Sequence, residues 1–290
     1  MPAQLCLGTV QFGMPYGVTN AVGQVAESEV CSILALASEA CIKWVDTAQA
    51  YGSAEEVVGR CSPSSAYYRF ISKLPANASP DIWEDNLQKS LQRLLTDRLD
   101  GFLLHRSEDL RGSNRDRLLD WLESTQERGL VDRIGVSIYD AHELKGLPLD
   151  RLQIVQLPLS LYDQRLVRDG TVSLLQSMGI SIHARSLFLQ GLLLRSSALW
   201  PEFLSPAFRA HHENFQNYLQ LKGFSLLEGA LASARSCQAL EALLIGVLTA
   251  SELQQILLAW NSCISLDSED LDRWSWDNQA DLDPRCWPSR

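Results

Sequence analysis

Polar side chains interrupt several apolar stretches of this chain at one recurring place, the carboxyl end of the stretch. They are Asp46, Lys73, His105, Ser137, Gln156 and Arg185. Taken singly, each has a structural explanation: Asp46 could cap a turn, Lys73 could be a surface lysine, and His105 could be a hydrogen-bonded core histidine. Carboxylate, ammonium and imidazole groups also transfer protons or stabilise charge in catalysis. If the apolar stretches are neighbouring strands of a parallel barrel, these groups meet in one active site.

The elements that would position these groups alternate along most of the chain. Short apolar runs at residues 4–8, 43–46, 70–73, 101–104, 133–136, 152–156, 180–184 and 243–247 are predicted strands. Amphipathic stretches predict helices at 28–40, from 54 onward, and at 80–95, 113–127, 171–177 and 208–236. Pro80 suits a first helical turn and Ser113 a helix cap. This alternation predicts an α/β fold, a (β/α)8 TIM barrel built as a single domain.

The alternative fold is an open doubly wound sheet, which would bind a dinucleotide on a glycine-rich turn after the first strand. The glycines near that place, Gly8, Gly13 and Gly17, do not have G-x-G-x-x-G spacing, and the chain has no G-x-x-x-x-G-K sequence. The absence of both phosphate-binding loops favours the barrel.

Length and composition are consistent with one large core. The 290 residues are 46% hydrophobic, and we expect a barrel over residues 1–265. Residues 266–290 interleave acidic residues with Trp274, Trp276 and Trp287 without helix or strand period, so this tail either caps the barrel mouth or is a loose end. The net charge of −10 argues against a nucleic-acid or anionic-membrane partner. The chain has no bilayer-length apolar run and no export signal at its start, so we expect a cytoplasmic protein.

The cysteines are scattered, with no C-x-x-C pair and no nearby histidine. They are Cys6, Cys31, Cys41, Cys61, Cys237, Cys263 and Cys286. This pattern predicts neither a disulfide framework nor a zinc site, so we expect reduced, mostly buried thiols and no bound metal.

One segment resembles a known family. Residues 45–59, VDTAQAYGSAEEVVG, resemble the signature of the aldo-keto reductases, with Asp46, a tyrosine five residues later at Tyr51, and a glutamate in the following helix. Lys73 in FISKLP and His105 in FLLHR fall where that family has its catalytic lysine and histidine. Weaker similarities in LGTVQFG, GVSIY, QLPLSLYD and SLFLQGLL extend the resemblance over residues 7–257.

The resemblance implies reduction of an aldehyde or ketone to an alcohol by hydride transfer from a nicotinamide cofactor, with Tyr51 as the proton donor. A free phenol titrates at about pH 10, so a neighbouring cation is needed to lower its pKa. Lys73 would supply that cation, and Asp46 would pair with it in a dry pocket. His105 would donate a hydrogen bond to the substrate carbonyl oxygen. The expected partner is a small-molecule carbonyl compound, and the expected assembly is a monomer or a weak homo-oligomer.

The resemblance also implies a cofactor site, with NADP expected and NAD as the alternative. Ser137 and Gln156 would bind the nicotinamide carboxamide, and residues 186–191 would lie along the pyrophosphate. The expected cofactor-binding residues are Gly8, Thr9, Ser137, Gln156, Arg185, Ser186, Leu187, Gly191, Gly246, Val247, Thr249, Glu252 and Gln255.

Four positions depart from the family pattern. Ile138 stands where an asparagine often contacts the carboxamide, and Arg185 stands where an aromatic ring often stacks on the nicotinamide. Leu248 replaces an arginine that clamps the phosphate of NADP, and Ile256 replaces an asparagine. Loss of that charged contact removes on the order of a few kcal/mol of preference for NADP over NAD. NADP stays the expected cofactor because it is the family's usual one.

Two other functions remain open. A non-catalytic barrel could bind a nicotinamide or a partner protein as a sensor or regulatory subunit, which the altered cofactor segment favours and the four catalytic residue types oppose. A metal-dependent barrel hydrolase could use His105, His183 and carboxylates, but no H-x-H or H-E-x-x-H spacing supports it.

Substrate selectivity in such a barrel lies in the loops at its mouth. We expect Trp200, Phe203, Phe208 and the tail tryptophans to form an apolar lid there, and a polar or sugar-like carbonyl compound to be the substrate.

Overall fold

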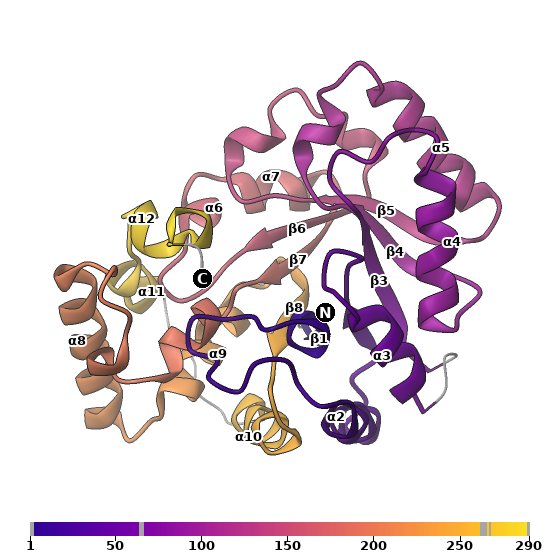
Figure 1. Ribbon diagram of the computed structural model, residues 1–290. Helices are drawn as coiled ribbons and strands as arrows, with labels where there is room; N and C mark the ends of the chain where they lie inside the picture. Colours follow the sequence, from indigo (N-terminus) through magenta and orange to yellow (C-terminus); the bar gives the residue numbers. More distant parts are fainter. Residues whose placement is uncertain (1–2, 64–66, 262–265, 267, 289–290) are drawn as a thin grey trace.

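Eight parallel strands close into a barrel in chain order (Figure 1). The computed structural model describes residues 3–63, 67–261, 266 and 268–288. Each strand pairs with the next, and β8 closes the barrel against β1, with Leu243 opposite Leu5. The strands are β1 Gln4–Gly8, β2 Trp44–Asp46, β3 Arg69–Leu74, β4 Leu99–Leu104, β5 Val131–Ser137, β6 Ile154–Pro158, β7 Ser181–Arg185 and β8 Leu240–Gly246. The predicted TIM barrel is confirmed, and the open doubly wound sheet is excluded.

Helices connect most of the strands and cover the outside of the barrel (Figure 1). They are α1 Val10–Gly13, α2 Glu27–Glu39, α3 Ala54–Cys61, α4 Trp83–Leu94, α5 Arg115–Glu127, α6 Arg165–Arg168, α7 Thr171–Ser177, α8 Pro206–Lys222, α9 Leu226–Ser236, α10 Ala250–Trp260, α11 Ser268–Trp274 and α12 Gln279–Leu282. The β5–β6 connection instead holds two 3-10 turns, η2 Ala141–Leu144 and η3 Leu149–Arg151. In the described part of the chain, no helix has the length and apolar character needed to cross a membrane.

Helix boundaries differ from the predicted ones by a few residues. α4 begins at Trp83 rather than Pro80, and Asn114 rather than Ser113 precedes α5. The predicted helical region 208–236 is divided by Gly223, which ends α8 with a positive φ of 76°, and by Ser225, whose side chain caps α9. A glycine in the left-handed conformation followed by a capping box is a strong stop and restart signal.

Side-chain alternation explains why polar residues recur at the strand ends. Residues two apart in a strand point to the same face. An apolar layer fills the barrel interior with Cys6, Trp44, Ile71, Leu103, Ile154, Ala242 and Leu244. Two positions beyond six of these residues stand Gly8, Asp46, Lys73, His105, Gln156 and Gly246. The alternation that packs the interior therefore brings these residues into the next layer, at the carboxyl ends of the strands.

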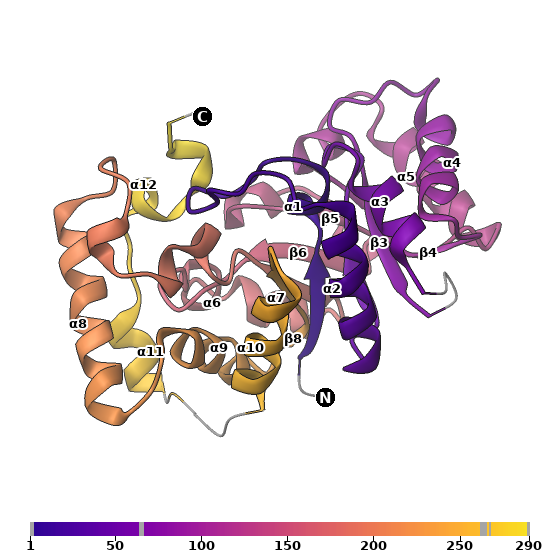
Figure 2. The same ribbon diagram turned by 60° about the horizontal axis from the view of Figure 1, so that its bottom comes forward.

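A second apolar core lies beside the barrel, where α8, α11 and α12 gather (Figure 2). Its buried members include Tyr162, Trp200, Phe208, Phe215, Trp274 and Trp287. Trp200 donates its indole N–H to the Leu192 carbonyl, and the Trp276 ring stacks on Phe208. The expected lid is therefore wrong: these aromatic residues pack on one another, and the lining of the barrel cavity contains none of them.

The tail contains short helices, contrary to the expectation that it lacks regular structure. α11 and α12 are seven and four residues long, too short for a hydrophobic period to show in the sequence. Asp281 fixes the tail to the start of α8 by accepting bonds from the backbone N–H and hydroxyl of Ser205. Arg285 reaches the barrel, where its guanidinium lies 4.0 Å from the centre of the Tyr139 ring. The predicted boundary between residues 265 and 266 lies partly outside the described residues.

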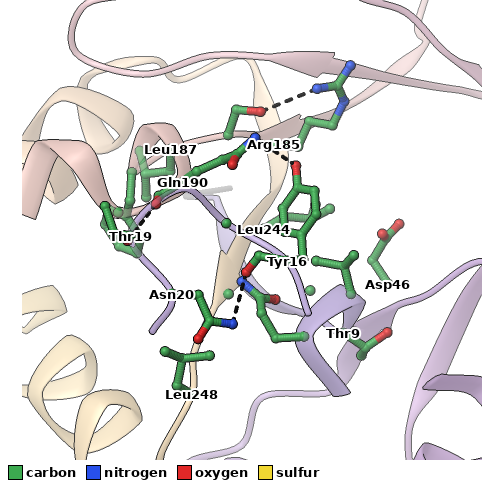
Figure 3. A pocket seen from close by; sticks show the side chains of 18 of the residues that line it. Thr9, Tyr16, Thr19, Asn20, Asp46, Arg185, Leu187, Gln190, Leu244 and Leu248 are labelled. Atoms are coloured by element: carbon green, nitrogen blue, oxygen red, sulfur yellow. Dashed lines mark hydrogen bonds between the residues drawn. The ribbon is translucent and has the colours of Figure 1, made fainter. Parts of the chain in front are cut away.

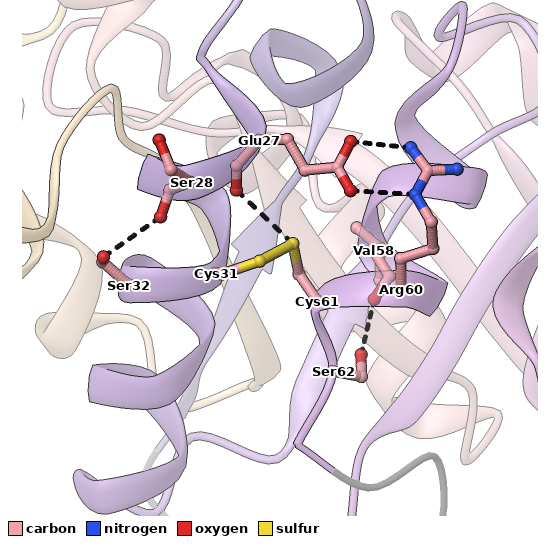
Figure 4. The surroundings of a disulfide bond; sticks show 8 residues. All are labelled: Glu27, Ser28, Cys31, Ser32, Val58, Arg60, Cys61 and Ser62. Atoms are coloured by element: carbon pink, nitrogen blue, oxygen red, sulfur yellow. Dashed lines mark hydrogen bonds and ion pairs between the residues drawn. A yellow bond between two sulfur atoms is a disulfide. The ribbon is translucent and has the colours of Figure 1, made fainter.

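Cys31 and Cys61 form a disulfide between α2 and α3 (Figure 4). The expectation that all thiols are reduced is therefore wrong for this pair. Helices that follow neighbouring strands lie side by side, so two residues 30 positions apart meet without any local sequence signal. Among the described free cysteines, Cys6 is buried, whereas Cys41 and Cys286 are exposed, so burial is not general either. Cys263 lies outside the described residues.

Candidate active site

A cavity of about 540 Å³ opens at the carboxyl ends of the strands. Most residues singled out from the sequence line it: Gly8, Thr9, Asp46, Tyr51, His105, Ser137, Gln156, Arg185, Ser186, Leu187, Gly191, Gly246, Glu252 and Gln255. Lys73 is buried beside the cavity and bonded to Asp46. Val247 is instead packed in the barrel core, and the Thr249 hydroxyl caps α10 by accepting a bond from the Glu252 N–H.

A buried ion pair forms the floor of the site. The Nζ atom of Lys73 donates to Oδ1 of Asp46 at 2.6 Å and to the Thr47 carbonyl at 2.8 Å. The second carboxylate oxygen, Oδ2, accepts from the side-chain amide of Gln156 at 2.7 Å. Both charged residues are only 1% exposed. Burial disfavours the charged ammonium, but Asp46 and Tyr51 outweigh that cost and raise the pKa of Lys73, so the lysine stays charged.

Tyr51 is close to both this ion pair and His105. The Lys73 Nζ atom is 5.2 Å from the centre of the Tyr51 ring, and the Tyr51 and His105 rings meet edge to face at 5.8 Å. Burial raises the pKa of Tyr51, and the Lys73 charge works against that rise. Burial, together with the Lys73 and Arg185 charges, lowers the pKa of His105 to about 4. At neutral pH the site therefore holds a protonated phenol and an uncharged imidazole.

A close backbone contact fixes the loop that carries Tyr51. A Cβ atom added to Gly13 would lie 1.8 Å from the Tyr51 carbonyl oxygen and 2.3 Å from the Ala54 nitrogen. Gly52, the residue after Tyr51, has a positive φ of 57°, and a Cβ atom added to it would lie 2.3 Å from the Gly13 carbonyl oxygen. Gly13 therefore fixes the position of this loop. It ends the LGTVQFG segment, but that local pattern does not predict a contact with Tyr51.

The glutamate of the signature segment, Glu55, holds α3, β3 and α4 together. Glu55 is buried on α3 and accepts hydrogen bonds from Ser72 on β3 and Ser90 on α4. The guanidinium of Arg93 lies 3.3 Å from its other oxygen. Ser72 immediately precedes Lys73, so these bonds tie α3, which begins shortly after Tyr51, to the strand that carries Lys73.

The loop after β7 is built from unusual backbone conformations. Ser186, Leu189 and Gln190 have positive φ angles of 65°, 46° and 55°, and Gly191 continues the run with 89°. The N–H groups of Leu189 and Gly191 donate within the loop, to the carbonyls of Ser186 and Phe188 at 2.9 and 2.8 Å. Non-glycine residues held in this region are strained, and such strain is concentrated at functional sites.

The loop that follows α1 is hydrogen-bonded to this segment (Figure 3). The Thr19 hydroxyl donates to the Gln190 carbonyl at 2.7 Å, and the Val18 N–H donates to the Gln190 side-chain oxygen at 2.9 Å. The Gln190 amide nitrogen donates to the Tyr16 hydroxyl at 3.3 Å. Tyr16, Thr19 and Gln190 all line the cavity. Gln190 lies within the predicted 186–191 segment, whereas Tyr16 and Thr19 were not predicted from the sequence.

The far end of the cavity is lined by Leu248, Glu252, Gln255 and Ile256. The carboxylate of Glu252 accepts the Leu248 backbone N–H at 2.7 Å. Ile138 is buried, and its carbonyl accepts a bond from Arg185. Ile138, Leu248 and Ile256, which differ from the family pattern, therefore lie at or near the cavity, and their side chains supply no polar contact.

The arrangement gives no support to a metal-dependent hydrolase. His105 lines the cavity, whereas His183 is buried in the barrel, meets the Trp44 ring edge to face and bonds to Glu241. Across the described ranges, no group of three or more His, Cys, Asp or Glu side chains could hold a metal ion.

The fold and the cavity together define a (β/α)8 barrel whose polar site lies at the carboxyl ends of the strands. The chain belongs to the aldo/keto reductase family, whose sequence profile matches residues 4–276. An aldo-keto reductase from Mycolicibacterium vanbaalenii is 35% identical over 136 residues, which make up 43% of this chain and 46% of that protein. The matched segment thus spans about half the length of that relative. The resemblance seen in the sequence is confirmed.

Solved structures share the fold at low sequence identity. A holo-form aldo-keto reductase from Bacillus halodurans is 18% identical, covers 94% of this chain and 91% of its own, and has a TM-score of 0.74. A glycerol dehydrogenase from Gluconobacter oxydans is 19% identical, covers 98% and 93%, and has a TM-score of 0.73. An aldo-keto reductase from Klebsiella pneumoniae in complex with NADPH is 20% identical, covers 94% of each chain, and has a TM-score of 0.71.

Proposed function

We propose that this protein reduces an aldehyde or ketone to an alcohol with NADPH, NADH being the alternative hydride donor. One observation carries the proposal: the charged Lys73 side chain lies 5.2 Å from the centre of the Tyr51 ring, and Tyr51 and His105 line the same cavity. Membership of the aldo/keto reductase family supports the same chemistry.

Tyr51 is the proton donor in this proposal. Its hydroxyl is protonated at neutral pH, because burial raises its pKa. When it gives up its proton to the carbonyl oxygen, the Lys73 ammonium stabilises the phenolate left behind. Asp46 and Gln156 hold that ammonium in place through the two bonded carboxylate oxygens. A bound reduced nicotinamide supplies the hydride.

His105 orients the carbonyl group. Because its pKa is lowered to about 4, the imidazole is neutral at physiological pH and carries one N–H donor. That donor can hydrogen-bond to the carbonyl oxygen and stabilise the charge that develops on it. The two donors, Tyr51 and His105, are adjacent, so both can converge on a single oxygen atom.

The cavity also suits a nicotinamide dinucleotide. The Thr9 hydroxyl and the Gln11 side-chain oxygen belong to cavity-lining residues, are buried, and have no hydrogen-bond partner among the described residues. Buried polar atoms are otherwise nearly always bonded, so these two are available to a ligand. Ser137 and Gln156 would hold the carboxamide, the 186–191 loop the pyrophosphate, and Glu252 and Gln255 the adenosine end. The barrel of residues 1–265 would carry the activity, and the 266–290 tail would support its mouth through Arg285.

The test is a turnover assay of the purified protein with NADPH or NADH and a panel of small aldehydes and sugar ketones. The proposal expects consumption of the reduced cofactor that depends on the carbonyl compound. Cofactor binding without turnover, by a sample shown to be folded, would instead favour the alternative function, a non-catalytic nicotinamide-binding sensor or regulatory barrel.

A further inference from the structure

Arg185 brings a cation to the catalytic end of the cavity. It is the last residue of β7, it lines the cavity, and its guanidinium lies 3.9 Å from the centre of the Tyr139 ring. One nitrogen donates to the Ile138 carbonyl at 2.9 Å and another to the Ser186 hydroxyl at 3.3 Å. These contacts use two of the five N–H donors of a guanidinium and hold its plane in a fixed orientation. The remaining donors are available to a ligand in the cavity.

The charge of Arg185 is not balanced by a neighbouring carboxylate. Across residues 3–63, 67–261, 266 and 268–288, Arg185 takes part in no ion pair. Arg285, which lies over the same Tyr139 ring, differs because it pairs with Asp283 at 2.7 Å and Glu143 at 3.1 Å. A half-buried cation without a counter-ion is costly, and a bound anion would offset that cost.

The other charges at this end of the cavity cancel. Lys73 and Asp46 neutralise each other at 2.6 Å. His105 is uncharged above a pH of about 4. Glu252, also in the lining, is bonded to the Leu248 N–H at the opposite end. Two arginines of the lining, Arg185 and Arg195, take part in no ion pair among the described residues, and Arg185 is the one whose charge acts on Tyr51 and His105. The part of the cavity where the carbonyl would react therefore carries the uncompensated positive charge of Arg185.

Uncharged hydroxyl groups lie near the Arg185 guanidinium. Desolvation of its hydroxyl, with the nearby phenols of Tyr139 and Tyr51, raises the pKa of Tyr16 to about 12, so this phenol stays protonated. Its oxygen already accepts from the Gln190 amide, which leaves the O–H to donate elsewhere. Figure 3 shows the Tyr16 hydroxyl and the Arg185 side chain on the same side of the cavity. A cation flanked by protonated hydroxyl groups is complementary to a carboxylate or phosphate.

We propose that the substrate of this enzyme is an anionic carbonyl compound, whose carboxylate or phosphate group binds Arg185 while its carbonyl oxygen lies between Tyr51 and His105. This inference rests on the proposed carbonyl reduction and names its substrate class. It assigns Arg185 to substrate binding, whereas the sequence resemblance suggested a position beside the nicotinamide ring.

The experiment measures kcat/KM for matched pairs of anionic and neutral carbonyl compounds. Suitable pairs are para-carboxybenzaldehyde with para-carbamoylbenzaldehyde, glyoxylate with its amide, and glyceraldehyde phosphate with glyceraldehyde. The pairs vary the distance between anion and carbonyl and separate a carboxylate from a phosphate. We expect at least one pair to favour the anion by about ten- to a hundredfold, the size of a charge-assisted hydrogen-bonded contact.

The deciding quantity is the anion-to-neutral ratio of kcat/KM in variants. Arg185→Met should lower that ratio about tenfold or more. If the variant also binds the cofactor more weakly, the ratio does not change on that account, because kcat/KM falls equally for both members of a pair. Arg185→Lys should restore part of the ratio. Arg106→Met is the matched control, since Arg106 is exposed, follows His105 directly, and is not in the cavity lining. It should change the ratio by less than about twofold, because screening weakens an exposed charge.

The outcomes separate this inference from the proposed function. Turnover of neutral compounds with no preference for any anion, or a preference that survives in Arg185→Met, would overturn the role of Arg185 and leave carbonyl reduction intact. An unchanged ratio with a weaker cofactor Kd would assign Arg185 to the cofactor. If no compound is turned over, calorimetric titration of the parent protein with cofactor and para-carboxybenzaldehyde still decides: binding no tighter than that of the carbamoyl analogue would contradict the inference.

Discussion

The ammonium group of Lys73 lies 5.2 Å from the centre of the Tyr51 ring, and Asp46 holds it there from a distance of 2.6 Å. The ion pair is almost completely buried, so water does not screen the effect of the cation on the phenol. Burial alone would make the tyrosine a weaker acid than it is in water. Lys73 opposes that effect, which is the electrostatic basis of the proposed proton transfer.

Replacing the lysine should change the pH dependence as well as the rate. Lys73→Met removes the cation that lowers the pKa of Tyr51, so the ionisation of the phenol should move to higher pH. In the direction of alcohol oxidation, which requires the phenolate, the rising limb of kcat should shift toward alkaline pH. Turnover at neutral pH should fall roughly a hundredfold, a typical loss for impaired acid–base catalysis.

The control for this variant also removes the Asp46 carboxylate, which would otherwise be left without its partner. In Lys73→Met, Asp46 loses its partner, which is itself destabilising. The double variant Asp46→Asn, Lys73→Met leaves no buried charge, and it should fold more stably than the single variant while keeping the shifted profile. A pH profile that matches the parent's in both variants would contradict the proposed role of the cation.

The contact between Gly13 and the Tyr51 backbone predicts a large effect from one methyl group. Gly13→Ala would place Cβ 1.8 Å from the Tyr51 carbonyl, so the loop must move. We expect a loss of about 1–3 kcal/mol in the free energy of unfolding, as for other overpacked sites, and reduced turnover in the protein that folds. Gly112→Ala is the control, because nothing lies within 4 Å of its added Cβ, and it should change stability by less than about 0.5 kcal/mol. Equal effects of the two substitutions in denaturant unfolding would show that the contact is not restrictive.

The disulfide between Cys31 and Cys61 should contribute to stability. It closes a loop with a sequence separation of 30, for which the chain-entropy relation gives about 3.6 kcal/mol. Cys61→Ser should therefore lower the free energy of unfolding by about 2–4 kcal/mol, and a reductant should destabilise the parent but not the variant. Cys41→Ser, at an exposed free thiol, should behave like the parent. A thiol titration of the denatured, unreduced parent that finds all seven cysteines free would contradict the bond.

The barrel was predictable because its signals are local and repeated. Each strand is an apolar run of three to seven residues, and the polar residue near its end marks the cavity face, so Asp46, His105 and Arg185 could be placed from the sequence. Gln156 was expected at the carboxamide, and its bond to Asp46 joins residues 110 positions apart that no local pattern relates.

The features that the sequence did not reveal depend on contacts between distant segments. The bonds from Thr19 and Val18 to Gln190 cross more than 170 positions, and the Cys31–Cys61 pair depends on how two helices pack. Trp200, Phe203, Phe208 and the tail tryptophans were expected over the mouth because aromatic residues suggest a lid. They pack instead around α8, since the same apolar surface is equally suited to a second core.

The most direct test of the account is turnover by Tyr51→Phe, measured beside the cofactor Kd of the same protein. The substitution removes one hydroxyl from a buried ring and leaves its contacts with His105 and Lys73. The account predicts an unchanged cofactor Kd and a fall in kcat of about two to four orders of magnitude, the contribution of a positioned acid. A variant that binds the cofactor normally and reduces carbonyl compounds at the parent rate would show that Tyr51 is not the proton donor.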